Sequence, residues 1–198
     1  MKPIITNNSS SSTAHSKMIN KNLTCHTGTP SNASQNISVS LDFLAEGTLR
    51  LSYKLTGDLT QILIPKAQNS TAVDGLWQNT CFELFIAVKG EANYHEFNFS
   101  PSGQWAAYAF SDYRVISEWT LSQKPTITFV QTKEYLNLVA IIPVNDLDQI
   151  IAGKPIELGI TAVIEANDGS HSYWALHHPL THPDFHHREG FILSLNQD

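Results

Sequence analysis

Two short segments near the middle of the chain set carboxylates and an amide among aromatic and aliphatic residues. Residues 82–86 contain Glu83, and residues 94–101 contain Glu96 and Asn98. Both segments alternate in the manner of β-strands, in which successive side chains point to opposite faces. If the two strands are neighbours, Glu83, Glu96 and Asn98 converge on one surface.

Two aromatic residues belong to the same predicted surface. Tyr94 shares its strand face with Glu96 and Asn98, and Trp77 precedes the first strand in a loop that contains Gly75. Rings on a surface of mixed polar and apolar character favour contact with a ligand. Carboxylates and amides suit the hydroxyl groups of a sugar, and exposed rings suit its C–H faces. The residues therefore predict a site for a small carbohydrate; a Trp77 that only covers the end of the fold is the structural alternative.

The two glutamates allow two further interpretations. Glu83 and Glu96 could be the acid and nucleophile of a glycoside hydrolase, whose carboxyl groups lie about 5–5.5 Å apart for retention and about 6.5–9.5 Å apart for inversion. Any two acids on adjacent strands can meet such spacings, so we expect no catalytic residues. A buried Glu83 could instead serve the fold as half of an ion pair with Arg114 or Arg188.

Histidines are dense near the end of the chain, but their spacing does not match a metal-binding motif. The six are His171, His177, His178, His182, His186 and His187. No zinc signature of the His-Glu-X-X-His kind occurs among them. A haem site of the Met/His type is not expected either, because the only methionines are Met1 and Met18, while haem ligation by two histidines is left open. We predict no metal site and no cofactor, and at most a single histidine contact to a ligand.

Short alternating segments recur along the chain and predict an all-β fold. About ten of them are separated by turns every 8–12 residues, which is typical of an antiparallel β-sandwich or barrel. At most one short helix is expected, at residues 145–151. Residues 1–20 are rich in Ser and Asn and predict a disordered tail. Residues 21–198 predict a single domain, which begins with an irregular lead-in.

Composition and charge exclude several classes of partner. The chain has 198 residues, a net charge of -6 and no basic run, so a nucleic-acid surface is not expected. No apolar stretch approaches the roughly 20 residues of a membrane-spanning helix. The N-terminal residues do not have the pattern of a secretory signal, and two cysteines do not suggest a disulfide framework. A cytoplasmic location is therefore expected.

Several motifs together resemble a known superfamily. Trp77 is followed six residues later by Glu83, and the chain closes with an aromatic pair, a polar loop and a segment that begins at Arg188. The motifs are Phe82-Glu-Leu-Phe-Ile86, Tyr94-His-Glu-Phe-Asn-Phe-Ser-Pro101, Tyr173-Trp-Ala175 and Arg188-Glu-Gly-Phe-Ile192. Over residues 23–196 they resemble the family 9 carbohydrate-binding modules and the related DOMON-like domains, in particular the bacterial DOMON-like subgroup.

The resemblance implies a β-sandwich of about ten strands and a non-catalytic binding module for a small carbohydrate. In sugar-binding members two tryptophans enclose a sugar ring, and these would be Trp77 and Trp174. Glu83 would accept hydrogen bonds from hydroxyl groups. Asn98 stands where sugar-binding members carry a basic side chain, so the preferred sugar is left open. A sandwich that has lost its ligand site and serves a structural or partner-binding role is the remaining alternative.

Overall fold

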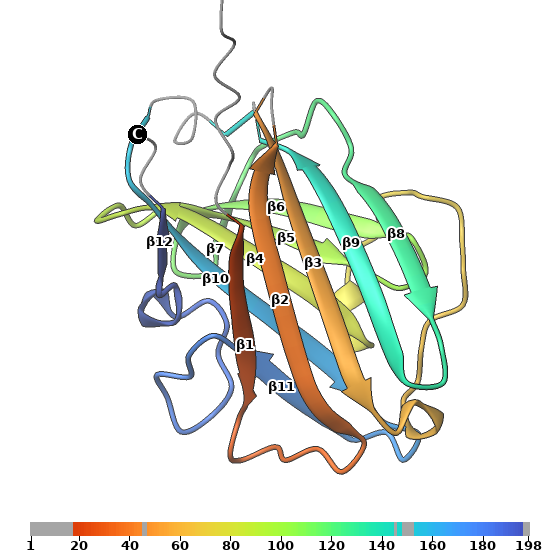
Figure 1. Ribbon diagram of the computed structural model, residues 1–198. Helices are drawn as coiled ribbons and strands as arrows, with labels where there is room; N and C mark the ends of the chain where they lie inside the picture. Colours follow the sequence, from red (N-terminus) through yellow and green to blue (C-terminus); the bar gives the residue numbers. More distant parts are fainter. Residues whose placement is uncertain (1–17, 45–46, 145, 148–152, 196–198) are drawn as a thin grey trace, which may run out of the picture.

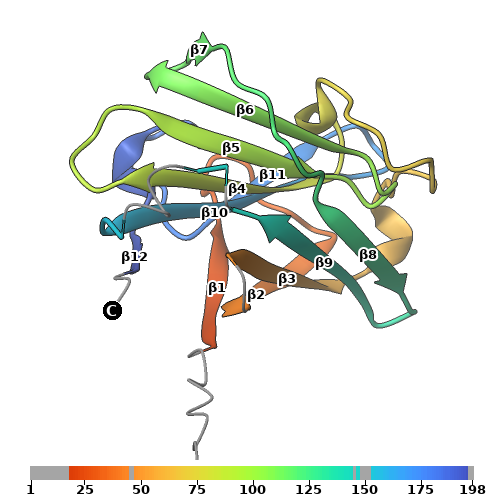
Figure 2. The same ribbon diagram turned by 90° about the horizontal axis from the view of Figure 1, so that it is seen from above.

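The computed structural model describes residues 18–44, 47–144, 146–147 and 153–195, which form a two-layered antiparallel β-sandwich (Figures 1 and 2). The first layer contains β1 (Ile19–Cys25), β2 (Ser34–Leu44), β3 (Thr48–Gly57), β8 (Thr126–Gln131) and β9 (Tyr135–Pro143). The second contains β4 (Cys81–Val88), β5 (Tyr94–Phe99), β6 (Trp105–Asp112), β7 (Val115–Ser117), β10 (Ile156–Glu165), β11 (His171–Ala175) and β12 (Leu193–Leu195).

The strand order shows how the layers are joined. The first layer runs β1-β2-β3-β9-β8, and the second runs β7-β6-β5-β4-β10-β11 with β12 beside β10. Pairing of β1 with β11 links the two. Three single-turn 3-10 helices lie in the connections: η1 (Leu59–Gln61), η2 (Leu76–Gln78) and η3 (Arg188–Gly190). No helix in the described part of the chain is long and apolar enough to cross a membrane.

The predicted antiparallel all-β sandwich is confirmed, with twelve strands among the described residues in place of the predicted ten or so. The predicted boundary of the tail at residue 20 is wrong, because β1 begins at Ile19 and pairs there with Leu41 of β2. Backbone hydrogen bonds make this pairing. The side chains at the start of β1 are mostly polar and therefore do not predict a strand there. Residues 1–17 lie outside the described residues, as does the predicted helix at residues 145–151 except for residues 146 and 147.

The main core lies between the two layers. Leu51, Tyr53 and Leu55 of β3 point into it, while Ser52 and Lys54 between them face outward. This period-2 alternation is typical of a sheet with one buried and one solvated face. The hydroxyl of Tyr53 also crosses the core and donates to the backbone carbonyl of Glu83 at 2.6 Å, which ties β4 to the opposite layer.

The outer face of the second layer is unusual because it too is buried around β4 and β5. Every residue of these two strands is buried, although antiparallel sheets commonly leave one face solvated. Phe85 and Tyr94 form a second, smaller apolar cluster there with Phe110 and Phe191. The candidate site lies on this covered outer face.

Candidate functional site

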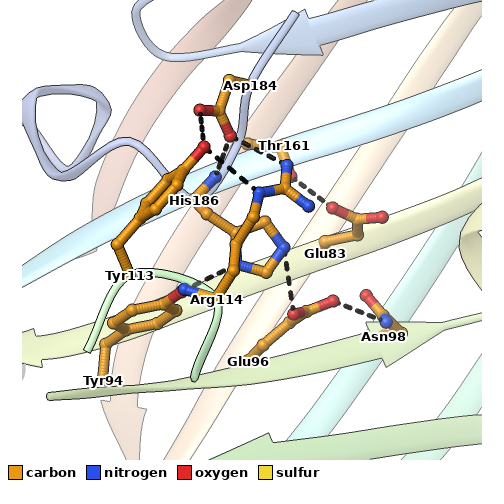
Figure 3. Close-up of polar contacts among 9 residues, drawn as sticks. All are labelled: Glu83, Tyr94, Glu96, Asn98, Tyr113, Arg114, Thr161, Asp184 and His186. Carbon is orange, nitrogen blue, oxygen red and sulfur yellow. Dashed lines mark hydrogen bonds and ion pairs between the residues drawn. The ribbon is translucent and has the colours of Figure 1, made fainter. Parts of the chain in front are cut away.

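A pocket of about 770 Å³ opens over the outer face of the second layer. Strands β4, β5, β6, β10 and β11 contribute its floor, and the loop after β11 and the β6–β7 turn contribute its walls. The polar and aromatic residues on which its chemistry depends are Trp77, Glu83, Glu96, Tyr108, Arg114 and His186. Figure 3 shows the polar contacts around its floor.

Glu83 lies at the centre of the floor. The strand register places it opposite Asn98 on β5 and opposite Thr161 on β10. Its side chain is 2% exposed, and the Thr161 hydroxyl donates to Oε2 at 3.0 Å. The other oxygen, Oε1, has no hydrogen-bond partner among the described residues and belongs to a side chain that lines the pocket.

Glu96 is the second carboxyl group of the floor. Phe85 lies two residues after Glu83 on β4, on the same face of the sheet, and it pairs with Glu96 on β5. Glu96 therefore shares this face with Glu83, one position further along the strand pair. The Asn98 amide donates to Glu96 Oε1 at 2.8 Å (Figure 3). The acceptor oxygen of Asn98, Oδ1, is buried without a protein partner. The predicted convergence of Glu83, Glu96 and Asn98 on one face is therefore confirmed.

Burial makes both carboxyl groups hold their protons more tightly. The pKa of Glu83 is raised first by loss of solvent and then by repulsion from Glu96, and these effects exceed the opposing influence of Thr161 and Arg114. The pKa of Glu96 is raised by the same loss of solvent. Two carboxyl groups in one dry site titrate as a pair, so near neutral pH the pair retains a proton.

Arg114 is the basic residue of the pocket, but its charge is already balanced. Its guanidinium lies 3.0 Å from Asp184, whose side chain is almost fully buried. Tyr113 donates to the same carboxylate at 2.7 Å, and the backbone N–H of His186 donates at 3.1 Å. These contacts lower the pKa of Asp184 against the effect of burial. Arg114 itself has φ of 56°, a left-handed conformation that costs a non-glycine residue roughly 1–2 kcal/mol.

His186 connects the wall to the floor. Its Nδ1 lies 2.8 Å from the Tyr94 hydroxyl, which accepts a hydrogen bond from the backbone N–H of Arg114. The other ring nitrogen of His186, Nε2, lies 3.7 Å from Glu96 Oε2. Burial and then Arg114 lower the pKa of His186 to about 4, so the ring is neutral and this contact is not an ion pair near neutral pH.

Trp77 lies at the mouth of the pocket. It belongs to η2, which begins after Gly75 in a left-handed conformation with φ of 77°. The side chain is 52% exposed although it is large and apolar. Nearby, the Tyr108 hydroxyl donates to Asp74 at 3.0 Å and holds a further carboxylate at the rim.

Comparison with known proteins identifies a related fold. No family model matches the sequence, and no curated protein matches it. The chain is similar to the crystal structure of a proposed carbohydrate-binding protein from Bacteroides uniformis. The TM-score is 0.60 at 19% sequence identity, over 90% of this chain and 86% of that chain. At this level of identity the likeness establishes the β-sandwich fold alone.

The structure brings three of the six predicted site residues together in the pocket: Trp77, Glu83 and Glu96. Tyr94 and Asn98 lie on the same sheet face but are fully buried beneath it. Tyr94 stacks on Phe110 with ring centroids 4.7 Å apart. These two residues therefore position the pocket's polar groups instead of lining it.

The predicted enclosure of a sugar ring between Trp77 and Trp174 is wrong. Trp174 is 5% exposed, packs in the core between the layers and donates from Nε1 to the Ser172 hydroxyl at 3.0 Å. Adjacent residues of a strand face opposite sides, so Tyr173 is the aromatic residue of β11 that lines the pocket. The resemblance named the right strand but the wrong face.

Two residues that line the pocket, Arg114 and His186, were missed or given another role by sequence reasoning. Arg114 was considered as an ion-pair partner of Glu83, but it pairs with Asp184, and Arg188 pairs with Glu157. His186 is the histidine that lines the pocket, and its place in a dense group of histidines gave no means of choosing it.

No group of three or more His, Cys, Asp or Glu residues suited to a metal ion occurs in the described ranges.

Proposed function

We propose that this protein is a non-catalytic binding module whose pocket takes a small carbohydrate. The observation that carries the proposal is a half-exposed tryptophan, Trp77, at the mouth of a pocket whose floor holds the buried carboxyl groups of Glu83 and Glu96. A sugar presents apolar C–H faces and a rim of hydroxyl groups, so a ring and convergent polar groups can bind it together.

The polar groups offer both kinds of hydrogen bond that a hydroxyl group requires. Glu83 Oε1 can accept, and the protonated member of the carboxyl pair and Arg114 can donate. The neutral ring of His186 can accept or donate according to its tautomer. The resemblance to DOMON-like domains and family 9 carbohydrate-binding modules supports the same function. So does the description of the Bacteroides uniformis protein that shares the fold.

A glycan array followed by calorimetry tests the proposal. We expect the parent protein to bind a mono- or disaccharide and Trp77→Ala to weaken that binding at least tenfold without lowering stability appreciably. Tyr135→Ala removes a ring from the opposite layer, outside the pocket, and should bind as the parent does. Failure of any glycan to bind, or equal binding by Trp77→Ala, would contradict the proposal.

A second candidate function is glycoside hydrolysis, which the shared pocket and raised pKa values of Glu83 and Glu96 favour. A glycosidase needs one carboxyl group that holds a proton and another that is ionised. Turnover of chromogenic glycosides that both Glu83→Gln and Glu96→Gln abolish would establish this reaction. We expect no turnover by the parent protein.

A further inference from the structure

The acidic groups of the pocket exceed its basic ones once the internal ion pair is set aside. Arg114 is balanced by Asp184 at 3.0 Å, and His186 is neutral. Asp74, Glu83 and Glu96 remain, and no Lys or Arg among the described residues lies within 4 Å of these three carboxylates. The pocket therefore combines a deficit of positive charge with a floor that water reaches poorly.

Two carboxyl oxygens of this floor have no hydrogen-bond donor among the described residues. Glu83 Oε1 belongs to a pocket-lining residue that is 2% exposed, and it receives no hydrogen bond from the described residues. Asn98 Oδ1 is also unpaired, but it lies buried beneath the floor. Glu96 Oε2 has only the 3.7 Å contact to His186, which is too long for a hydrogen bond. One oxygen of each pocket-lining carboxyl group, Glu83 Oε1 and Glu96 Oε2, thus lacks a protein donor.

From this arrangement we infer that the pocket selects a sugar with a protonated amine, whose ammonium group binds between Glu83 and Glu96. The inference rests on the proposed carbohydrate function and narrows it to amino sugars. An ammonium group carries three donors and one positive charge. It can therefore donate to Glu83 Oε1 and Glu96 Oε2 and also offset the negative charge of the carboxyl pair, which a neutral hydroxyl group cannot do.

The aromatic lining suits the same ligand. Rings surround the acidic floor on several sides: Trp77, Phe85, Tyr108, Phe110, Tyr173 and Phe185. Cations are attracted to the faces of aromatic rings, and the attraction is stronger where the cation has lost its water. A metal ion fits this lining poorly, since metal ions need several oxygen or nitrogen ligands at short distance and no such group of three occurs among the described residues.

Calorimetric titration with matched sugars tests the inference. The probes are D-glucosamine, D-galactosamine and D-mannosamine, each compared with its N-acetyl derivative and its parent hexose. At about pH 7 the amines are largely protonated, whereas both comparison sugars are neutral. We expect one amino sugar to bind at least tenfold more tightly than both of its neutral counterparts.

Substitutions of the pocket carboxylates test whether their charge produces the preference for an amino sugar. Glu83→Gln and Glu96→Gln keep the shape of the floor but remove its charge, so each should reduce the preference for the amine about tenfold. Glu91→Gln removes a carboxylate of an exposed ion pair outside the pocket and should leave it unchanged. Binding of the amine should also release protons, because an ammonium group favours the ionised form of a carboxyl pair that otherwise retains a proton.

The outcomes separate this inference from the function on which it rests. Neutral sugars that bind as tightly as the amines would overturn the amine preference and leave the carbohydrate site standing. Absence of binding by charged and neutral sugars alike would overturn both. A preference that is lost after dialysis against a chelator would also overturn the inference, because a metal ion would then supply the positive charge. The comparison of sugars on the parent protein decides the matter even if a variant fails to fold.

Discussion

Replacement of Glu83 by Gln should change how the stability of the protein depends on pH. Burial and the neighbouring Glu96 raise the pKa of Glu83 from 4.5 to about 8. The folded chain then binds this proton more tightly than the unfolded chain does. The resulting stabilisation is complete below about pH 4.5 and is lost as the pH rises towards 8. Glutamine has no such proton, so Glu83→Gln should not show this loss.

The neutral range isolates the effect of Glu83 from that of His186. The pKa of His186 is lowered from 6.5 to about 4, so its contribution has the opposite sign and is lost as the pH falls below 6.5. Burial also lowers the pKa of His178, which acts in the same direction and range. Between pH 6.5 and 8 the two histidines contribute little, and the buried carboxyl pair is the dominant source of change.

The size of the effect follows from the width of that interval. A change of one pKa unit corresponds to about 1.4 kcal/mol. From pH 6.5 to about 8 the parent protein should therefore lose about 2 kcal/mol of unfolding free energy through Glu83. Glu96 titrates with Glu83 and adds to this loss. The Glu83→Gln protein should keep its unfolding free energy over the same range, except for the smaller loss that the titration of Glu96 still causes.

Urea unfolding at a series of pH values measures the difference directly. Glu91→Gln is the matched control, because its carboxylate is exposed in an ion pair with Lys154 and it should follow the parent curve. If Glu83→Gln and the parent lose equal stability between pH 6.5 and 8, the carboxyl group of Glu83 is not held protonated by burial, and the reasoning is refuted.

Three substitutions test the positions of side chains in and around the pocket. Trp174→Ala should lower the unfolding free energy by about 3–5 kcal/mol because its ring packs in the core, whereas Trp77→Ala should lower it by less than about 1 kcal/mol. Thermal and urea melts compare the two variants. Equal losses would contradict the placement of Trp174 in the core and of Trp77 at the surface. Arg114→Ala should cost about 1–3 kcal/mol, since it leaves the buried carboxylate of Asp184 without its cation. An Arg114→Ala protein as stable as the parent would show that the pair adds nothing to the fold.

The sheet and the floor of the pocket could be predicted from the sequence because both depend on local alternation. Glu83 stands between Phe82 and Leu84, and Glu96 and Asn98 alternate with Phe97. Period-2 patterns assign each side chain to a face, and only the pairing of the two strands had to be assumed. The observed register, with Glu83 opposite Asn98, supplied that missing step.

The error at Trp174 has a local cause. Tyr173 and Trp174 are both aromatic, so the motif does not show which of them faces the pocket. The register of β11 decides: Trp174 pairs with Ala162 of the core, and Tyr173 pairs with Val163, which lines the pocket. A strand of five residues contains too few alternations to fix its orientation from the sequence.

The walls of the pocket escaped prediction because they depend on contacts distant in sequence. Arg114 lies in the turn between β6 and β7, while Asp184 and His186 lie in the loop after β11. The ion pair joins residues 70 positions apart. Loop geometry of this kind carries no periodic signal, and the left-handed conformation of Arg114 is not one that its residue type would suggest.

The burial of both faces of β4 and β5 explains why the protein tolerates an acidic floor. A carboxyl group on an ordinary solvated face would keep its usual pKa and its water, and would distinguish poorly between a ligand and solvent. Covering loops remove that water from Glu83 and Glu96, which reduces stability as the pH rises but strengthens every polar contact a ligand can make. The core between the layers, tied to β4 through Tyr53, provides the rigidity that holds the two carboxyl groups together despite their repulsion. The loss of stability at higher pH and the proposed capacity to bind a ligand thus arise from the same structural feature.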